Sequence, residues 1–276
     1  MAASTTDTRE QVYNVREDDQ LSSGVALVTC VLAQREIYIA GFSINKELLT
    51  IHYSDYSSNK PVWELDFFEQ LFASEPLLAV REKVRGIFVA SNRNLIVPDE
   101  LYSETAAAGW LRKLHFVERQ EALSGYALEN DRATYIQALP LNIAELIRIN
   151  FRKATVRPLP YYQFCERPAM SLHLQLCFTK GQCIATLHNY SQLLWHSYID
   201  YSCAEDVAYA LRHYCKENYI DAGKLHITCN ALAASEFDTI NELSRYFTIV
   251  KAGNGLTINN PWTPPVTLAN QLLECV

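Results

Sequence analysis

Closely spaced glycines are the first feature that phosphate-binding chemistry requires, because backbone N–H groups must approach a phosphate without a Cβ in the way. The chain holds only 9 glycines in 276 residues, and Gly253 and Gly255 form the only close pair. This pair flanks Asn254 and is typical of a hairpin turn. The spacing excludes a P-loop and a dinucleotide-binding fingerprint.

Thiol and imidazole groups are the next candidates, as metal ligands or nucleophiles. None of the 8 cysteines stands in a Cys-x-x-Cys pair, the spacing expected of a zinc or redox motif. Cys177 and Cys183 are predicted on paired strands, but a zinc site would need two further ligands, and only His173 is available on the same strand face. His188 and His196 flank one predicted hairpin, and we expect them to be solvated and not to converge. The sequence predicts no metal site and no cofactor.

The net charge of the chain limits the classes of molecule that it is expected to bind. The formal net charge is −7 at pH 7, with 24 basic residues against 31 acidic ones, so the chain lacks the electrostatic footprint of a nucleic-acid binder. No apolar run approaches the ~18 residues of a membrane-spanning helix, and the first ten residues show no apolar signal-peptide core. We therefore expect a cytoplasmic protein that binds neither nucleic acid nor membrane.

The elements that position these residues begin with three strands joined by short polar turns, which predict an antiparallel meander. A helix over 61–74 and a short, fully apolar strand over 86–90 follow. A strand at 95–97 and a helix over 99–113 complete this first block. The strands of the predicted meander are 25–32, 36–42 and 48–53.

A second block repeats this order. Its meander is followed by a helix over 203–217, an apolar strand over 225–229 and a helix over 235–247. Two short strands, 248–250 and 256–258, flank the Gly253–Gly255 turn. The two blocks show no residue-by-residue identity, so we interpret the repeat as one of pattern only. The strands of the second meander are 172–178, 182–188 and 193–199.

Three strands, a helix, a strand and a helix form the order of a ribonuclease-H-like unit. Two such units predict an α/β protein with the duplicated architecture of actin and the sugar kinases. We expect a mixed five-stranded sheet in each unit, with strand two at one edge and helices on both faces. Strands 85–90 and 224–229 should be central, since they lack polar alternation. The expected organisation is a disordered or frayed N-terminus (1–20), a first unit (21–120), a connecting hairpin and helices (121–168) and a second unit (169–276).

The connecting segment is the candidate for partner binding, because elements added to a shared scaffold tend to carry family-specific function. It holds a predicted hairpin over 123–139 and a helix over 141–149. Arg and Tyr are enriched at interaction hot spots, so we expect this face to contact an unidentified protein partner or a second copy of the chain. The alternative is that the same residues only bridge the two units. The candidates are Arg148, Arg152, Lys153, Arg157, Tyr135, Tyr161 and Tyr162.

Two local stretches, together with the repeat, carry a resemblance to a known family. They are Asn94–Tyr102 and Leu141–Val156, and the second ends in Asn-Phe-Arg-Lys-Ala followed by Thr-Val. The chain resembles the bacterial domain of unknown function 3822 family over roughly residues 22–260. The resemblance implies a fold similar to that of actin-like ATPases. The family has no assigned activity, so the resemblance leaves the function open.

The resemblance also locates the positions at which an actin-like ATPase would hold nucleotide. In such proteins an Asp-x-Gly turn joins the first two strands of each unit, where aspartates hold Mg²⁺ and backbone N–H groups hold phosphate. Neither corresponding turn contains an aspartate, and the loop at 229–235 lacks the paired glycines of an adenosine site. The vestigial phosphate-loop positions are Gln34 and Arg35 in the first turn, and Thr179, Lys180 and Gly181 in the second.

These absences favour a catalytically degenerate actin-like protein that acts as a binding or scaffold module, without ATP and without enzymatic activity. The alternative is a nucleotide-dependent ATPase or phosphotransferase with atypical phosphate loops. A nuclease of the ribonuclease-H type would need carboxylates on the first and fourth strands to bind two metals. The first strands, 25–32 and 172–178, contain none.

Overall fold

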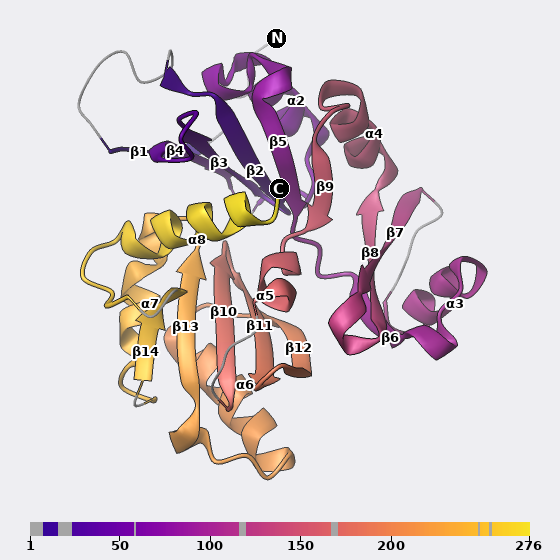
Figure 1. Cartoon of the computed structure of the whole chain (residues 1–276), viewed down its shortest axis with the longest axis vertical. Coiled ribbons are helices and arrows are strands. Elements are labelled where there is room, and N and C mark those ends of the chain that lie inside the picture. The colour runs from indigo at the N-terminus through magenta and orange to yellow at the C-terminus, as the bar shows by residue number, and fades with distance from the viewer. Residues whose placement is uncertain are drawn as a thin grey trace. The chain divides into compact units, whose positions relative to one another are not determined.

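The computed structural model (Figure 1) describes residues 8–15, 24–57, 59–115, 120–166, 171–247, 249–253 and 256–276. Internal contacts divide the chain into two units, one of residues 1–159 with Val276 and one of residues 160–275. Each unit is built on its own mixed sheet. In the part of the chain that the structure describes, no helix is long and apolar enough to cross a membrane.

The first unit holds a sheet of six strands in the order β1-β4-β3-β2-β5-β9. Strands β2, β3 and β4 form the predicted antiparallel meander, and β5 and β9 continue the sheet in parallel with β2. The prediction of five strands was wrong for this unit. The prediction that strand two lies at an edge of the sheet was also wrong, because a meander places its middle strand, β3, between its two neighbours. The strands are β1 (Thr8–Asn14), β2 (Leu27–Ala33), β3 (Glu36–Phe42), β4 (Leu48–Tyr56), β5 (Val84–Val89) and β9 (Thr155–Pro158).

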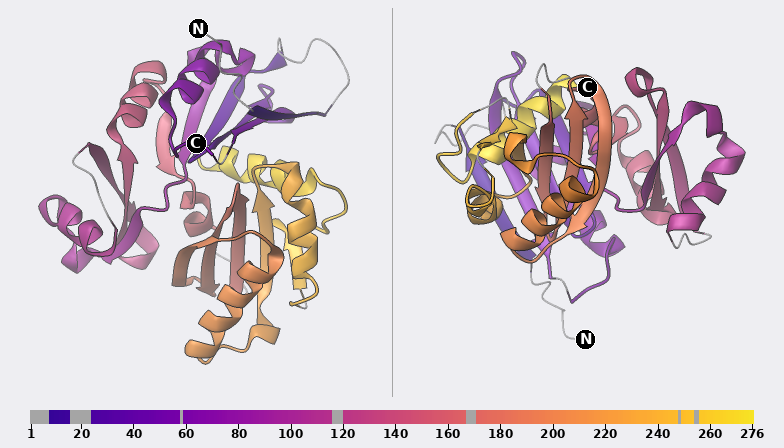
Figure 2. Two further views of the ribbon diagram at one scale, coloured as in Figure 1. Left: turned by 180° about the vertical axis from the view of Figure 1, so that it is seen from behind. Right: turned by 90° about the horizontal axis from the view of Figure 1, so that it is seen from below.

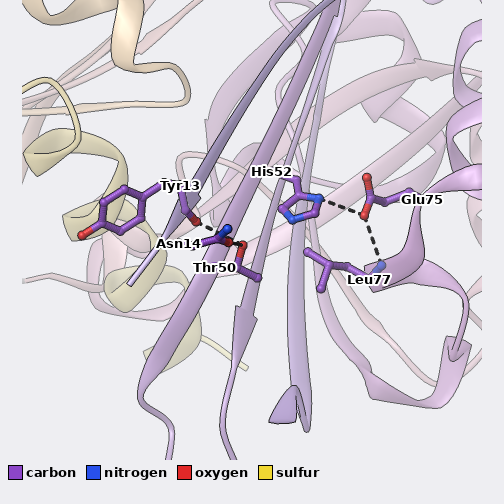
Figure 3. Close-up of polar contacts among 6 residues, drawn as sticks. All are labelled: Tyr13, Asn14, Thr50, His52, Glu75 and Leu77. Carbon is purple, nitrogen blue, oxygen red and sulfur yellow. Dashed lines mark hydrogen bonds and ion pairs between the residues drawn. The ribbon is translucent and has the colours of Figure 1, made fainter. Parts of the chain in front are cut away.

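Strand β1 corrects the prediction that residues 1–20 are frayed, since Thr8–Asn14 pair antiparallel with β4. The Thr50 hydroxyl lies 3.0 Å from the carbonyl oxygen of Tyr13 and 2.7 Å from Oδ1 of Asn14 (Figure 3). Backbone pairing provides the bonds, so the segment needs no apolar pattern of its own. Residues 1–7 and 16–20 lie outside the described residues.

A second polar contact in Figure 3 ties β4 to the end of the first crossover helix. His52 Nδ1 lies 3.0 Å from Glu75 Oε1, and the same carboxylate accepts the N–H of Leu77. Burial opposes ionisation of Glu75, but the bonds from His52 and Leu77 outweigh it and lower the pKa of Glu75. The contact fixes the chain where it leaves helix α2 (Leu65–Ser74).

Two helices cover the core of the first unit. The buried Phe67, Phe68 and Phe72 of α2 pack with Ile143 and Ile147 of α4 (Leu141–Asn150) in one cluster. Helix α2 joins β4 to β5, and α4 leads into β9. Each is therefore a crossover between strands of the sheet.

A small three-stranded module stands between β5 and α4. Its strands have the order β6-β8-β7, and helix α3 packs beside them (Figure 1). The predicted hairpin over 123–139 is present as β7 and β8. The predicted helix 99–113 belongs to this module and is not the second helix of the repeat, a role that α4 fills. The elements are β6 (Asn94–Pro98), α3 (Glu104–Leu114), β7 (Glu121–Leu128) and β8 (Ala133–Pro140).

The second unit holds the predicted five-stranded sheet, in the order β12-β11-β10-β13-β14. Strands β5 and β13 have neighbours on both sides in their sheets, which confirms that both are central. Strand three, β12, and not strand two, lies at the edge. The strands are β10 (His173–Thr179), β11 (Gln182–Asn189), β12 (Gln192–Asp200), β13 (His226–Ala231) and β14 (Ile249–Ala252).

Helices lie on both faces of this second sheet, as predicted. Helix α6 (Ala204–Glu217), seen on one face in Figure 2, and α7 (Phe237–Leu243) share a core with Leu176 and Cys229. On the opposite face, Asn230 bonds to Tyr162 of α5 (Tyr161–Cys165) and to Gln271 of α8 (Thr263–Glu274).

Helix α8 was not predicted from the sequence, because Pro264 and Pro265 stand at its start. Proline is tolerated in the first turn of a helix, where the N–H groups have no partner within the helix. The predicted strand 256–258 is absent, although Leu256 accepts the N–H of Ala252. Part of the Gly253–Gly255 turn lies outside the described residues.

Candidate functional site

The turn between β2 and β3 holds the first pair of predicted phosphate-loop residues, Gln34 and Arg35. The carbonyl oxygen of Gln34 accepts the N–H of Trp63 at 2.7 Å and the hydroxyl of Tyr56 at 2.8 Å. The guanidinium of Arg35 donates to the carbonyl oxygen of Lys60, at 3.3 and 3.2 Å from Nε and one terminal nitrogen. Both residues are therefore bound to the segment that leads into α2.

The turn between β10 and β11 is the second predicted position, and it is a tight hairpin. Gly181 has φ +73°, a conformation that glycine adopts without strain. The Thr179 hydroxyl donates to the carbonyl oxygen of Gln182 at 3.0 Å. The Tyr201 hydroxyl donates to the carbonyl oxygen of Thr179 at 3.1 Å. Lys180 and Gly181 therefore form the turn of an ordinary antiparallel hairpin.

A five-residue sequence element contacts each of the two turns, although the sequence analysis predicted no identity between the repeats. Tyr-x-Asp-Tyr-Ser occurs at 53–57 and again at 198–202, where β4 and β12 end. Tyr56 donates its N–H to the carbonyl of Arg35, and Tyr201 donates its N–H to that of Gly181. The prediction that the repeats have no identity was wrong, because this match appears only when the strand registers are aligned.

The aspartates of the repeated element lie opposite the first residue after each turn. Glu36 and Asp55 are buried cross-strand neighbours, and the Tyr53 hydroxyl lies 2.8 Å from one carboxylate and 3.0 Å from the other. Burial, then the charges of Glu36 and Asp55, raise the pKa of Tyr53. In the second unit, Gln182 donates to Asp200 at 2.8 Å. Of the described residues, no group of three or more His, Cys, Asp or Glu is placed to hold a metal ion.

The predicted partner face is brought together only in part. Arg148, Arg152 and Lys153 are exposed, and Arg148 pairs with Glu145 at 2.6 Å. Tyr135 and Tyr162 are 0% and 2% exposed, so their proposed contact with a partner was wrong. Tyr135 lies in strand β8 and Tyr162 in helix α5, and each side chain is on the face of its element that is buried in the core. Arg157 and Tyr161 are half-buried, and Tyr161 and Tyr162 belong to the second unit.

Two histidines expected to be solvated pack within the second unit, His188 fully buried and His196 half-buried. His188 is fully buried in β11, and His196 contacts Thr186 through Nδ1 at 3.0 Å and the ring of Phe164. Burial lowers the pKa of His196 to about 3. His188 lies opposite Leu193 in the β11–β12 ladder. The solvated assignment was wrong because this sheet face is covered by α5.

A groove of about 840 Å³ lies in the first unit and includes the β2–β3 turn. Its walls come from the turn, the segment before α2, both ends of the inserted module and the first turn of α4. No short sequence window contains it, which is why motif analysis did not find it. The lining residues are Gln34, Val62, Trp63, Ser91, Asn92, Arg93, Gln120, Glu121, Ala138, Pro140, Leu141, Asn142 and Glu145.

The chemistry of this groove is amide-rich and nearly neutral. Its charged side chains are Arg93, which is paired with Glu121, and Glu145, which is paired with Arg148. Carboxamides both donate and accept hydrogen bonds, as a peptide backbone does. Apolar side chains, among them Val62 and Leu141, complete the lining. The carboxamides are those of Gln34, Asn92, Gln120 and Asn142.

Trp63 is the most constrained residue of the groove. Its φ is +59°, a conformation that costs free energy for a bulky side chain. The N–H bond to Gln34 and the Tyr56 hydroxyl, which also contacts Pro61 O and Glu64 N, hold the backbone there. Strained residues of this kind cluster at binding sites.

Comparison with solved structures identifies the architecture. A protein from Bacteroides thetaiotaomicron VPI-5482, described as having an actin-like ATPase fold and unknown function, is similar with a TM-score of 0.68 at 15% identity, over 91% of this chain and 99% of that one. A chain of the PilM–PilN type IV pilus biogenesis complex is similar with a TM-score of 0.59 at 13% identity, over 91% and 98%. No curated protein matches the sequence.

These similarities show that the chain has the actin-like ATPase fold, as the two repeats and the family resemblance implied. At such identities they show the fold alone. The model of a protein family of unknown function, DUF3822, matches residues 42–250, which is more than half of the sequence. The chain therefore belongs to the DUF3822 family.

Proposed function

We propose that this protein is a catalytically degenerate member of the actin-like fold that acts as a binding module. Its groove in the first unit takes an extended segment of a protein partner. The observation that carries the proposal is the lining itself, with four carboxamides, paired charges and apolar side chains around the β2–β3 turn. Such a lining complements a peptide backbone with small apolar side chains.

A nucleotide suits this lining poorly. A triphosphate brings close to four negative charges, and their desolvation must be offset by metal, converging N–H groups or cations. At the first turn, a backbone carbonyl and a guanidinium are already bonded within the protein. The groove's arginine is paired with Glu121.

The fold relatives support a binding role in a limited way. One chain of the PilM–PilN type IV pilus biogenesis complex shares the fold, and that chain was solved together with another protein. The Bacteroides protein has no known function. We therefore carry over to this chain only the idea that such a body binds another protein. The exposed Arg148, Arg152 and Lys153 lie on and just after α4, whose first turn lines the groove, and we propose that they extend the contact.

Site-specific crosslinking tests the proposal in the native cell. A photoreactive phenylalanine analogue is placed at Leu141, a 47% exposed residue of the groove, and as a control at Leu101, which is 56% exposed outside it. We expect Leu141 to give a defined crosslink to one protein, mapped by mass spectrometry to one segment.

The mapped segment, made as a synthetic peptide, is then titrated into purified protein. We expect Asn142→Leu and Leu141→Asp to weaken peptide binding about 10-fold or more, since each loses a contact worth about 1.4 kcal/mol or more. Leu101→Asp, at the exposed crosslinking control position outside the lining, is the matched control. Crosslinks from Leu101 but none from Leu141, or a peptide that binds all variants equally, would contradict the groove assignment.

A further inference from the structure

Helix α6 carries a polar stripe beside a groove of the second unit. Buried apolar residues attach the helix to one face of the second sheet (Figure 2). Four exposed residues follow one another at intervals of four, three and four, which places them along one side of the helix. Together with Tyr246 they line a groove of about 410 Å³. The four are Glu205, Tyr209, Arg212 and Lys216.

Bonds within the second unit hold two members of this stripe in place. Arg212 donates to the carbonyl oxygen of Tyr246 at 2.8 Å, and its guanidinium lies over the rings of Tyr246 and Phe247. The Tyr246 hydroxyl donates to Oε1 of Glu205 at 2.8 Å. This bond lowers the pKa of Glu205, so the carboxylate is charged at neutral pH. The stripe therefore presents an anion at one end and a fixed cation further along.

Tyr209 and Lys216 are available for contact with another molecule. Tyr209 is 74% exposed, and its ring is stacked nearly parallel to that of His213, with centroids 6.1 Å apart. Among the described residues, no ion pair joins Lys216 to a carboxylate. Tyr and Arg are residue types enriched at interaction hot spots. The stripe thus holds an oriented aromatic ring and a cation that an external partner would pair.

The order of these residues is self-complementary. The spacing of four, three and four reads the same in both directions, and it is the spacing at which two helices pack side by side. When a second α6 lies antiparallel against the first, Glu205 faces Lys216 and Tyr209 faces Arg212. Parallel pairing would instead place Glu205 against Glu205 and Lys216 against Lys216, which is unfavourable.

We propose that α6 packs antiparallel against α6 of a second copy of this chain, about a two-fold axis that passes between Ala210 and Leu211. Both contacts then occur twice, because each copy uses the same surface. The guanidinium of Arg212 is planar, so one face lies over the ring of Tyr246 and the other is left for the partner's Tyr209.

A second copy suits the stripe better than an acidic segment of another protein. An acidic segment would neutralise Arg212 and Lys216 but would repel Glu205. A second copy supplies a cation to Glu205 and an anion to Lys216. The chain carries a net charge of −7, so two copies repel at long range and the local pattern of charges must specify the pairing. The contact is one helix wide, and we therefore expect a reversible dimer and not an obligate one.

Charge reversal in the full-length protein tests the pairing, by sedimentation equilibrium over a concentration series. Glu205→Lys and Lys216→Glu each place like charges opposite each other twice per dimer. We expect each to raise the dissociation constant by roughly 3- to 30-fold, and the shift to shrink at high salt. The double variant, Glu205→Lys with Lys216→Glu, restores opposite charges and should return the dissociation constant to within about 3-fold of the wild-type value.

Overall repulsion alone predicts a different result. Glu205→Lys makes a chain of net charge −7 less negative, and it would strengthen association if net charge decided the outcome. Lys224→Glu, at an exposed residue of the same unit outside α6, is the matched control for Lys216→Glu. It should leave the dissociation constant within about 2-fold of the wild-type value, because salt screens charges remote from the interface.

Tyr209→Ala tests the aromatic contact separately. Alanine favours a helix, so the variant should remain folded, and the loss of two ring contacts should raise the dissociation constant by roughly 3- to 30-fold. Tyr190→Ala, in the β11–β12 turn at a residue 57% exposed, is the matched control and should dimerise as the wild type does. Unfolding temperatures confirm that each variant is folded.

A wild-type protein that stays monomeric at the highest concentration it tolerates would overturn the proposal, and would point to an acidic partner for Arg212 and Lys216. A dimer that tolerates both single reversals, or that the double variant does not restore, would overturn it as well, because its interface would then lie elsewhere. The proposal does not depend on the groove of the first unit, so its failure would leave the proposed function standing.

Discussion

The hydroxyl of Tyr56 lies 2.8 Å from the carbonyl oxygen of Gln34, within the turn where an actin-like ATPase would hold phosphate. The same hydroxyl contacts Pro61 O at 3.0 Å and accepts the N–H of Glu64 at 3.1 Å. Tyr201 occupies the matching place in the second unit. In this protein the turns are closed by tyrosines from within each unit, and the first turn forms part of the groove wall.

Tyr56→Phe should therefore destabilise the protein. The variant removes a buried hydroxyl with three polar contacts, and we expect the free energy of unfolding to fall by about 1 to 2 kcal/mol. Urea denaturation measures the loss. Tyr219→Phe, at a residue 98% exposed, is the control and should change stability by less than about 0.5 kcal/mol. Equal effects of the two substitutions would show that the Tyr56 contacts do not hold the turn.

Two glycines with different surroundings give opposite predictions. A Cβ at Gly253 would lie 2.7 Å from Asn230 Oδ1 and 2.8 Å from Thr267 Cγ2, so Gly253→Ala should destabilise the second unit by about 1 to 3 kcal/mol. Gly109 in α3 has no atom within 4 Å of such a Cβ. Gly109→Ala should stabilise the protein by about 0.5 to 1 kcal/mol, through helix propensity. Thermal unfolding of both variants checks the signs, and a stabilising Gly253→Ala would contradict the packing around Asn230.

His173 makes stability depend on pH in a defined direction. Burial, and then the charge of His226, lower the pKa of His173 to about 4, below the usual value near 6.5. The unfolded chain therefore takes up the proton first as pH falls. Stability should be full above pH 6.5 and decline between about 6.5 and 4, by about 2 kcal/mol at pH 5.

Denaturation at several pH values tests this slope. His173→Gln keeps a polar group near the Thr228 hydroxyl, 3.0 Å from Nε2 in the wild type, but cannot titrate. Its stability should be flatter over this range. His213→Gln, at an exposed position, should retain the wild-type slope. A wild-type slope in His173→Gln would mean that other groups bind the protons.

The sequence predicts those strands whose burial requires an apolar composition. The run Leu225–Cys229 was identified as central because it lacks polar alternation, and β13 indeed has neighbours on both sides. Strand β1 escaped notice because backbone pairing holds it and its side chains are largely exposed. Helix α8 was not predicted because prolines usually indicate the absence of a helix, and here they lie in the first turn, which tolerates them.

The groove could not be predicted from the sequence. Its wall joins residues from Gln34 to Glu145, so only the fold brings them together. The exposure of Arg148, Arg152 and Lys153 could be predicted because charged side chains are rarely buried, but the burial of Tyr135 depends on strand register. The Tyr-x-Asp-Tyr-Ser repeat was present in the sequence, and a search aligned on the ends of the third strands would have found it.

Calorimetric titration of the purified protein with Mg-ATP distinguishes a protein-binding module from a nucleotide-dependent enzyme. We propose that this actin-like protein binds a protein segment and that bonds within each unit close the turns where phosphate would lie. We expect no heat of binding from Mg-ATP, because the turns lack aspartate and the Gln34 and Arg35 groups are already bonded. The same sample should bind the peptide identified by crosslinking from Leu141. Micromolar affinity for Mg-ATP would contradict the account and favour an ATPase or phosphotransferase with atypical loops.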